Sequence, residues 1–345
     1  MYVTYSLETS QTVFVDIDCG QQPHCPRYCQ DEHFKKMYCT PICRAEISKS
    51  TCNQGLKPPI TPKYTGYHFW PQNSSSFQLV NKDDWYSNTV YFGQQFGKHF
   101  TDTLTFPSDG DYTANLTIQN VEMIDGLLLE DYFFDWSGGV VGLAPGDGNI
   151  VTQLYAQNLI PMPTALLVIG HVGYTGVLGF GIDVDGFDVC DQHYIQRPTM
   201  NSNYWVFELE DFELNGLSYG KKTKALLSDN DNWIYLLSKF MRRLVDLKVI
   251  SIYDGPEVDN HAYIFPCDQL FELTLTVDGQ NLTVSKSALT WKPIGNNTCL
   301  SFLGPLEHPH YLTNVDMVLG ISFLSEFCVS FDYEQMTMSF AKRIL

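Results

Sequence analysis

The sequence predicts an all-β protein built from two strand-rich halves. Short runs of alternating apolar and polar residues recur along the chain with turn residues between them, and helical periodicity is confined to two stretches. The chain has 345 residues, enough for two lobes with separate cores, and its hydrophobic content of 44% is typical of a globular protein. We expect an N-terminal β lobe over residues 1–185 and a C-terminal β lobe over residues 186–345.

The first half is predicted to begin with six short strands. Alternating apolar residues place them at residues 2–7, 12–17, 76–80, 88–92, 104–106 and 115–118. A short helix is expected over residues 150–157, followed by paired strands at 164–170 and 176–182. Residues 183–203 are polar and rich in turn formers, so this segment is the predicted boundary between the lobes.

The second half is predicted to repeat this pattern. A strand restarts at residues 204–209, and apolar residues at helical spacing over residues 233–249 predict a helix that packs on the core. Further strands are expected at residues 273–277, 282–284, 317–322, 328–333 and 337–341. Each half contains an apolar strand, a polar loop and a later G-L-A or V-L-G turn, and this order suggests a duplication.

Charge and hydropathy exclude two classes of partner. The net charge is -18, which argues against binding to a nucleic-acid backbone. No apolar run approaches the ~20 residues that span a bilayer, and the first residues do not form a signal peptide, so we expect a mature soluble monomer with no membrane partner. The composition indicates no cofactor.

The ten cysteines favour disulfides in an oxidising compartment, because their number is even and six are crowded into residues 19–52. We interpret 19–52 as an insertion stapled by disulfides, although C-P-R-Y-C and C-T-P-I-C also have a spacing that zinc sites use. These six are Cys19, Cys25, Cys29, Cys39, Cys43 and Cys52. Four glycosylation sequons support a secreted protein or one in the lumen of an acidic secretory compartment, at Asn73, Asn115, Asn281 and Asn296.

Two stretches carry the candidate chemistry. Residues 13–20, V-F-V-D-I-D-C-G, bring Asp18 to the tip of a strand that stops at a glycine. Residues 225–233, A-L-L-S-D-N-D-N-W, form a second apolar run with Ser228 at the matching position. His308 and His310 are a weaker candidate for a metal site: no third ligand lies at useful spacing, so we expect a surface loop and no metal.

Five motifs in order resemble the pepsin-like aspartic proteases over essentially the full chain. V-F-V-D-I-D-C-G resembles the first active-site strand, S-G-G-V-V-G-L-A the D-G-I-L-G-L-A motif, and A-L-L-S-D-N-D-N the second active-site strand. Y-W-V-F-E-L-E-D-F-E-L-N-G and D-M-V-L-G-I-S-F-L-S-E-F-C-V-S-F-D are similar to second-lobe segments. The resemblance implies two β lobes related by pseudo-twofold symmetry, a cleft between them, and a hairpin flap with Tyr91 or Phe92 at its tyrosine position.

The same resemblance bears on the remaining cysteines. Cys267 and Cys299 match the paired cysteines of the family's second lobe in spacing and setting, which leaves Cys190 with Cys328 by elimination. The six cysteines of residues 19–52 allow 15 connectivities that the sequence does not separate.

The family's mechanism needs one carboxylate from each lobe, and the two share one proton so that one acts as base and the other as acid. The resemblance assigns the first carboxylate to Asp18 and places Ser228 at the second. Cys19 and Asp229 replace the threonines that lock the two loops, and Asn230 replaces a glycine. We therefore predict an inactive homologue that keeps its cleft or surface for a peptide or protein ligand.

Two alternatives remain open. A one-residue slip would make Asp229 the second carboxylate, and Asp231 is a further candidate; with either, the chain would be an active aspartic endopeptidase that uses Asp18 as the first. In the other alternative the Cys-rich insertion, residues 19–52, is itself the binding surface.

Overall fold

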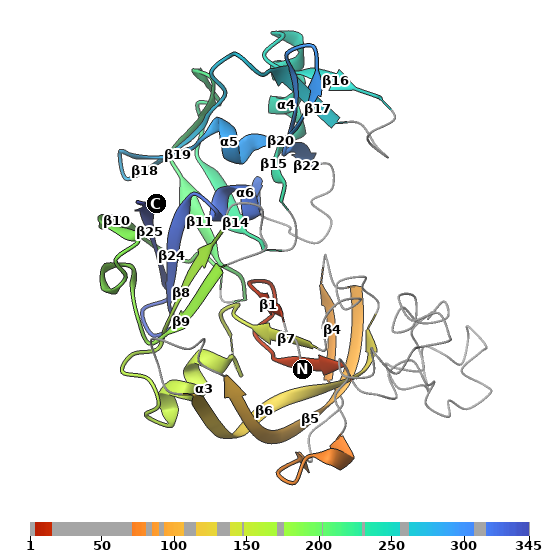
Figure 1. Ribbon diagram of the computed structural model, residues 1–345, viewed down its shortest axis with the longest axis vertical. Helices are drawn as coiled ribbons and strands as arrows, with labels where there is room; N and C mark the ends of the chain where they lie inside the picture. Colours follow the sequence, from red (N-terminus) through yellow and green to blue (C-terminus); the bar gives the residue numbers. More distant parts are fainter. Residues whose placement is uncertain are drawn as a thin grey trace, which may run out of the picture. The chain divides into compact units, whose positions relative to one another are not determined.

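The computed structural model describes residues 4–15, 71–80, 85–89, 93–106, 115–129, 139–146, 148–170, 176–201, 203–229, 232–255, 262–306 and 315–344 (Figure 1). The chain divides into two compact units. Residues 1–143 and 147–159 form the first unit, and residues 144–146 and 160–345 form the second. The described residues are mostly strand with a few short helices, which confirms the all-β prediction.

The first unit holds one seven-stranded sheet, in the order β1-β7-β2-β6-β5-β3, with β4 paired to β5. Its strands are β1 (Thr4–Ser6), β2 (Val13–Val15), β3 (Gln78–Leu79), β4 (Trp85–Thr89), β5 (Gly93–Phe106), β6 (Leu116–Leu129) and β7 (Gly139–Gly142). A 3-10 helix, η3 (Pro71–Asn73), precedes β3. Buried apolar side chains on these strands form the core of the unit, among them Phe14, Phe100, Val121 and Ile124.

Strands β5 and β6 are much longer than predicted and pair from Gln95 with Leu129 to Phe106 with Leu116. Figure 1 shows them as a long curved pair of ribbons. Only residues 104–106 and 115–118 were predicted as strand, because polar residues such as Glu122 interrupt the apolar pattern. Val121 and Met123 are buried while Glu122 between them is only partly buried, so the strand alternates as a sheet with one solvated face does.

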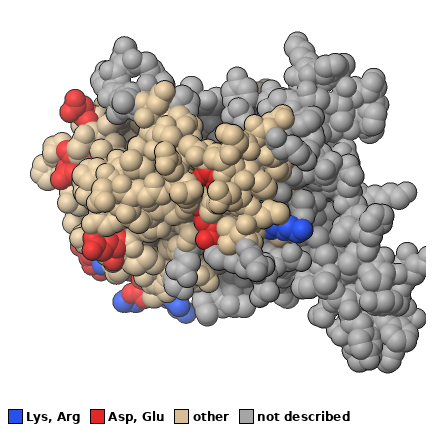
Figure 2. All heavy atoms as spheres, turned by 90° about the horizontal axis from the view of Figure 1, so that it is seen from below, with Lys and Arg blue, Asp and Glu red and all other residues tan. Residues whose placement is uncertain are grey.

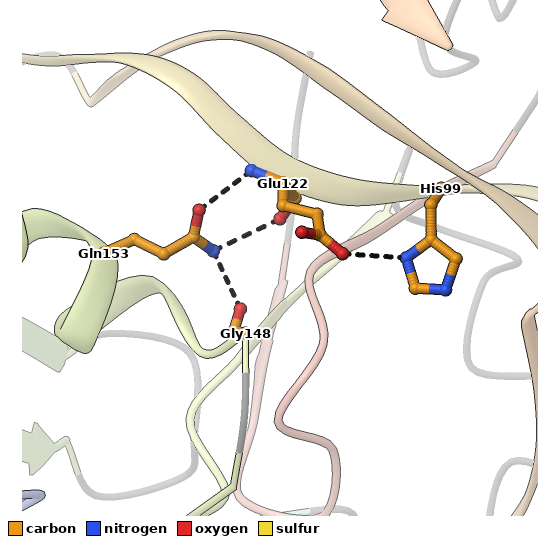
Figure 3. A network of polar contacts seen from close by, with 4 residues as sticks. All are labelled: His99, Glu122, Gly148 and Gln153. Carbon is orange, nitrogen blue, oxygen red and sulfur yellow. Dashed lines mark hydrogen bonds and ion pairs between the residues drawn. The ribbon is translucent and has the colours of Figure 1, made fainter. Parts of the chain in front are cut away.

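The predicted helix at residues 150–157 is confirmed as α3 (Ile150–Ala156). Asn149 caps its first turn, since its Oδ1 accepts the N–H of Thr152 at 2.9 Å. The Gln153 side chain then bonds the edge of β6 like one residue of a neighbouring strand: Oε1 accepts the N–H of Glu122 at 2.8 Å, and Nε2 donates to the Glu122 carbonyl at 3.2 Å. Nε2 also donates to the Gly148 carbonyl at 2.8 Å, and Glu122 reaches His99 through its carboxylate (Figure 3).

The second unit holds four sheets. The first has the order β10-β25-β24-β8-β9. Its strands are β8 (Thr164–Ile169), β9 (Gly176–Phe180), β10 (Cys190–Pro198), β24 (Phe327–Asp332) and β25 (Thr337–Arg343). The antiparallel pairing of β8 with β9 confirms that prediction. The predicted boundary at residue 185 falls inside this unit, where η5 (Val184–Gly186) packs on the sheet at β10, β24 and β25.

The second sheet has the order β11-β14-β23-β15-β22. Its strands are β11 (Val206–Leu209), β14 (Thr223–Leu227), β15 (Ile234–Leu237), β22 (Leu303–Leu306) and β23 (Met317–Leu319). The helix predicted over residues 233–249 is wrong in its first turn: Ile234–Leu237 is strand, and α4 (Ser238–Asp246) starts only afterwards. Backbone pairing with both β22 and β23 overrides the helical spacing there.

Two further sheets complete the second unit, in the orders β13-β12-β18-β19 and β16-β17-β21-β20. The strands of the former are β12 (Asp211–Leu214), β13 (Leu217–Ser218), β18 (Leu273–Val277) and β19 (Gln280–Val284). Those of the latter are β16 (Ser251–Tyr253), β17 (Ala262–Pro266), β20 (Thr290–Gly295) and β21 (Thr298–Ser301). Two short helices are α5 (Lys286–Leu289) and α6 (Ile321–Leu324).

Both disulfides predicted outside the Cys-rich segment are confirmed. Cys190 in β10 is bonded to Cys328 in β24, and Cys267 is bonded to Cys299 in β21. The six cysteines of residues 19–52 lie outside the described residues. The predicted disulfide chemistry therefore holds for the four cysteines that the structure describes.

The core of the second unit is aromatic at its centre. The Trp205 ring lies 4.8 Å from that of Phe331 and 5.2 Å from that of Tyr333, measured between centroids, and burial raises the pKa of the Tyr333 hydroxyl. No helix in the described part of the chain has the length and apolar character to cross a membrane. Figure 2 shows acidic side chains at several separate places on one face, so the described atoms of that face form no single charged patch.

Candidate active site

The sheet β11-β14-β23-β15-β22 of the second unit fixes the position of Ser228. β14 runs parallel to β23, and Ala225, Leu226 and Leu227 pair with Met317, Val318 and Leu319. Ser228 follows directly, and its N–H donates to the Leu319 carbonyl at 3.0 Å. Its side chain is 1% exposed. Ser228 is therefore a buried residue held in register at the end of the strand.

The loop after Ser228 is held at its far end. Asp229 is also buried, whereas Asn230 and Asp231 lie outside the described residues. The Asn232 carbonyl accepts the N–H of Ser322 at 3.3 Å and also accepts the Ser322 hydroxyl. α6 thus anchors the point at which the loop enters β15.

A serine at the end of β14 has limited chemistry. Its hydroxyl is neutral, donates one hydrogen bond and accepts others, and does not ionise in the acidic range. It is able to bind a polar group of a ligand, but not to carry the charge or the shared proton of a carboxylate. Asp229 beside it is an acid, at the position that the sequence comparison gives to a threonine.

The first unit contains a similar group of strands. β1 runs parallel to β7, and β2 runs antiparallel to β7 and parallel to β6. β2 is the strand that leads towards Asp18, which itself lies outside the described residues together with Cys19. The strand before Asp18 and the strand before Ser228 therefore differ in the direction of their pairing: β2 is antiparallel to β7, whereas β14 is parallel to β23.

Comparison with families of known proteins decides the assignment. The model of the family described as eukaryotic aspartyl protease matches residues 61–343. The chain belongs to the eukaryotic aspartyl protease family. The match begins after Ser6 and Asp18, and comparison with curated proteins returns no match. The pepsin-like resemblance predicted from the motifs is thus confirmed at the level of the family.

In this member of the aspartyl protease family the strands on either side of the predicted flap residues form a hairpin. β4 and β5 pair antiparallel from Trp85 with Gly97 to Thr89 with Gly93. Residues 90–92 connect the two strands, so Tyr91 and Phe92 belong to the connection. Both residues lie outside the described ones, and the choice between them stays a prediction.

Two buried residues that the sequence analysis did not select are Ser6, the last residue of β1, and Glu8, which follows β1. Ser6 is 0% exposed and Glu8 is 4% exposed. The N–H of Glu8 donates to the Ser6 hydroxyl oxygen at 3.1 Å. The signal that would have found them is a serine in Y-S-L-E, which lies at the end of one apolar strand and before the next, like the serine in L-S-D-N.

The described residues hold no cluster of three or more His, Cys, Asp or Glu side chains arranged for a metal. His308 and His310 are outside the ranges that the structure describes, so their predicted place in a surface loop is untested. The four sequon asparagines, in contrast, are described, and all four are exposed: Asn73, Asn115, Asn281 and Asn296.

Proposed function

We propose that the chain is a secreted aspartyl protease homologue without peptidase activity, which binds a peptide or protein ligand. The observation that carries the proposal is Ser228, buried at the end of β14 and hydrogen-bonded through its N–H to Leu319. This is the position at which the resemblance to the family puts the second carboxylate. A serine there leaves the chain without that acid.

The chemical reason is the sharing of a proton. Two carboxyl groups in contact cannot both ionise, so one stays protonated and acts as acid while the other, ionised, acts as base on the attacking water. A serine hydroxyl is no substitute for either form, because it does not release its proton in the acidic range. With one acid removed, the remaining acid has no partner with which to divide these two roles.

Binding is the function that this fold retains when the chemistry is lost. The strands around Ser228 are paired over their length, and the disulfide between Cys267 and Cys299 is formed in the same unit. Loss of a carboxylate therefore leaves the scaffold in place. Members of the family recognise peptides, and a neutral serine leaves the polar contacts of such a ligand possible.

Secretion is part of the proposal and is supported by two observations. Two disulfides are formed, as in proteins of oxidising compartments. All four sequon asparagines are exposed, as a bulky glycan attached to the folded protein requires. Expression in cultured eukaryotic cells behind a signal peptide should give a product whose mobility increases after treatment with an N-glycosidase, and an unchanged mobility would contradict this part.

A peptidase assay tests the loss of activity. The purified protein is incubated with an unfolded protein substrate from mildly to strongly acidic pH, with and without a statine-type inhibitor, beside an active pepsin-like enzyme as control. We expect no inhibitor-sensitive cleavage by the wild-type chain. Inhibitor-sensitive cleavage that disappears in Asp18→Asn would overturn the proposal, and Asp229→Asn and Asp231→Asn would then identify the second acid.

A displayed peptide library tests the binding function. Peptides selected on the wild-type protein are titrated against Ser228→Leu and against Ser251→Leu, which replaces an exposed serine on β16. We expect Ser228→Leu to weaken binding by about tenfold or more, the equivalent of one or two lost hydrogen bonds, and Ser251→Leu to leave it unchanged. Equal affinities for both variants would place the ligand elsewhere.

A further inference from the structure

The two units contain the same four-strand motif in the same chain order. In the first unit β1 pairs parallel with β7, β2 pairs antiparallel with β7, and β2 pairs parallel with β6. In the second unit β14 pairs parallel with β23, β15 pairs antiparallel with β23, and β15 pairs parallel with β22. The counterpart of β14 is therefore β1, and the counterpart of β15 is β2.

The register makes this equivalence specific to single residues. The sequence V-V-G at the end of β7 matches V-L-G, which is the end of β23 and the glycine after it. Val141 in the first unit is therefore the equivalent of Leu319 in the second. Val141 pairs with Tyr5, and Leu319 pairs with Leu227. Tyr5 is thus equivalent to Leu227, and the next residue, Ser6, is equivalent to Ser228.

The other flank of the motif gives the same answer independently. Val140 pairs with Val13, and the matching residue Val318 pairs with Tyr235. Tyr5 to Val13 and Leu227 to Tyr235 are then the same number of residues apart, so the loop between the two strands has equal length in both copies. No insertion or deletion is needed to equate Ser6 with Ser228.

Local contacts agree with the register. Ser6 and Ser228 are 0% and 1% exposed. The Leu143 N–H donates to the Ser6 carbonyl at 2.8 Å, and the Ser228 N–H donates to the Leu319 carbonyl at 3.0 Å. Each serine thus lies at the end of the parallel ladder of its own unit, β1 with β7 and β14 with β23. The Ser6 hydroxyl oxygen accepts the N–H of Glu8, two residues on, a bond that a carboxylate at this position would also accept.

We propose that Ser6, and not Asp18, occupies the first carboxylate position of the family, so that both copies of the motif carry serine. This deepens the proposed loss of activity and rests on it. By the same equivalence, Asp18 follows the counterpart of β15 and corresponds in chain position to Phe240, a buried residue of α4. The loss is then complete: neither position holds an ionisable acid, and each holds a neutral hydroxyl.

Cross-linking of introduced cysteines tests the assignment. In this family the two carboxylates share a proton, so thiols at the two true positions should react with one short cross-linker. The variants Ser6→Cys with Ser228→Cys, and Asp18→Cys with Ser228→Cys, are treated with dibromobimane and mapped by mass spectrometry. We expect the bridge in the first pair alone. A bridge in the Asp18 pair, or none in the Ser6 pair, would overturn the assignment.

A second test restores the family's D-T-G sequence and measures the melting temperature with a statine peptide, so it needs no added cysteine. One variant restores D-T-G in the second loop only, by Ser228→Asp, Asp229→Thr and Asn230→Gly. The doubly restored variant carries these three changes and also D-T-G in the first loop, by Ser6→Asp, Leu7→Thr and Glu8→Gly. A statine peptide should raise the melting temperature of the doubly restored variant by about 5 °C and leave the other unchanged.

Stabilisation of the variant with only the second loop restored, lost again on Asp18→Asn, would overturn the assignment to Ser6. These outcomes are separate from the peptidase assay. Cleavage by the wild-type chain would contradict the proposed function whichever residue holds the first position, whereas the cross-link reports only on which residue holds it.

Discussion

Gly142 lies so close to Gln11 that residue 142 has no room for a side chain. A Cβ built on Gly142 would come 2.5 Å from the Gln11 carbonyl oxygen and 2.6 Å from the Ser10 carbonyl carbon. Both are backbone atoms, which cannot rotate away as the end of a side chain can. The glycine therefore lets the loop between β1 and β2, which begins directly after Ser6, pack directly on the end of β7.

The first prediction follows from this contact. Gly142→Ala should lower the free energy of unfolding by about 3 kcal/mol, the upper end of the usual cost of overpacking, because the loop must move as a whole. Gly186→Ala is the matched control, since nothing lies within 4 Å of its added Cβ, and it should change stability by less than ~0.5 kcal/mol. Urea unfolding of the oxidised proteins measures both. Equal stabilities would show that the loop is not held by β7.

The second prediction concerns the two disulfides of the second unit. Cys190 and Cys328 are 138 residues apart in sequence, and Cys267 and Cys299 are 32 apart. Because a longer closed loop restricts the unfolded chain more, removing the former should cost about 5 kcal/mol and removing the latter about 4 kcal/mol. Double alanine variants of each pair, unfolded by urea, give the two values. A larger loss from the shorter loop would contradict this order.

Much of the fold was predictable because its signals are local. The strand at Leu273–Val277 alternates strictly between buried and half-buried residues, and α3 starts at a capping asparagine before an apolar stripe. The disulfide between Cys267 and Cys299 was predicted from the family spacing and is formed. In each case a few neighbouring residues, or a known spacing, determine the element.

The prediction failed or was incomplete where partners distant in sequence decide the structure. Ile234–Leu237 has helical spacing with the residues that follow, yet it is strand because β22 and β23, more than sixty residues later, pair with it. The equivalence of Ser6 and Ser228 is hidden for the same reason. It rests on the pairings of β1 and β2 with β7, whereas in the sequence Asp18 follows a more apolar strand than Ser6 does.

The third prediction concerns Gln153, whose side-chain amide continues the ladder of β6 at Glu122. Gln153→Leu removes its three hydrogen bonds and should speed exchange of the Glu122 amide hydrogen by about tenfold or more, because a bonded N–H loses its acceptor. Gln157→Leu, which removes one bond to the Gln119 carbonyl at an exposed site, should leave the Glu122 amide unchanged. Hydrogen exchange followed by NMR resolves the two. Unchanged exchange in Gln153→Leu would show that β6 does not depend on α3.

The last prediction concerns Tyr333, whose pKa burial raises above its model-compound value of 10.0. In the unfolded chain the hydroxyl ionises near pH 10, while in the folded protein it stays neutral. The unfolded state therefore binds fewer protons above that pH, and stability falls as pH rises, by up to about 1.4 kcal/mol for each pH unit. Below pH 9 both states keep the proton, so this group gives no pH dependence there. Tyr333→Phe should remove this part of the alkaline slope, measured as the free energy of urea unfolding from pH 9 to 11. Parallel slopes for the wild-type chain and Tyr333→Phe would mean that Tyr333 ionises as readily in the folded protein as in the unfolded one, and that the core around Trp205 admits water.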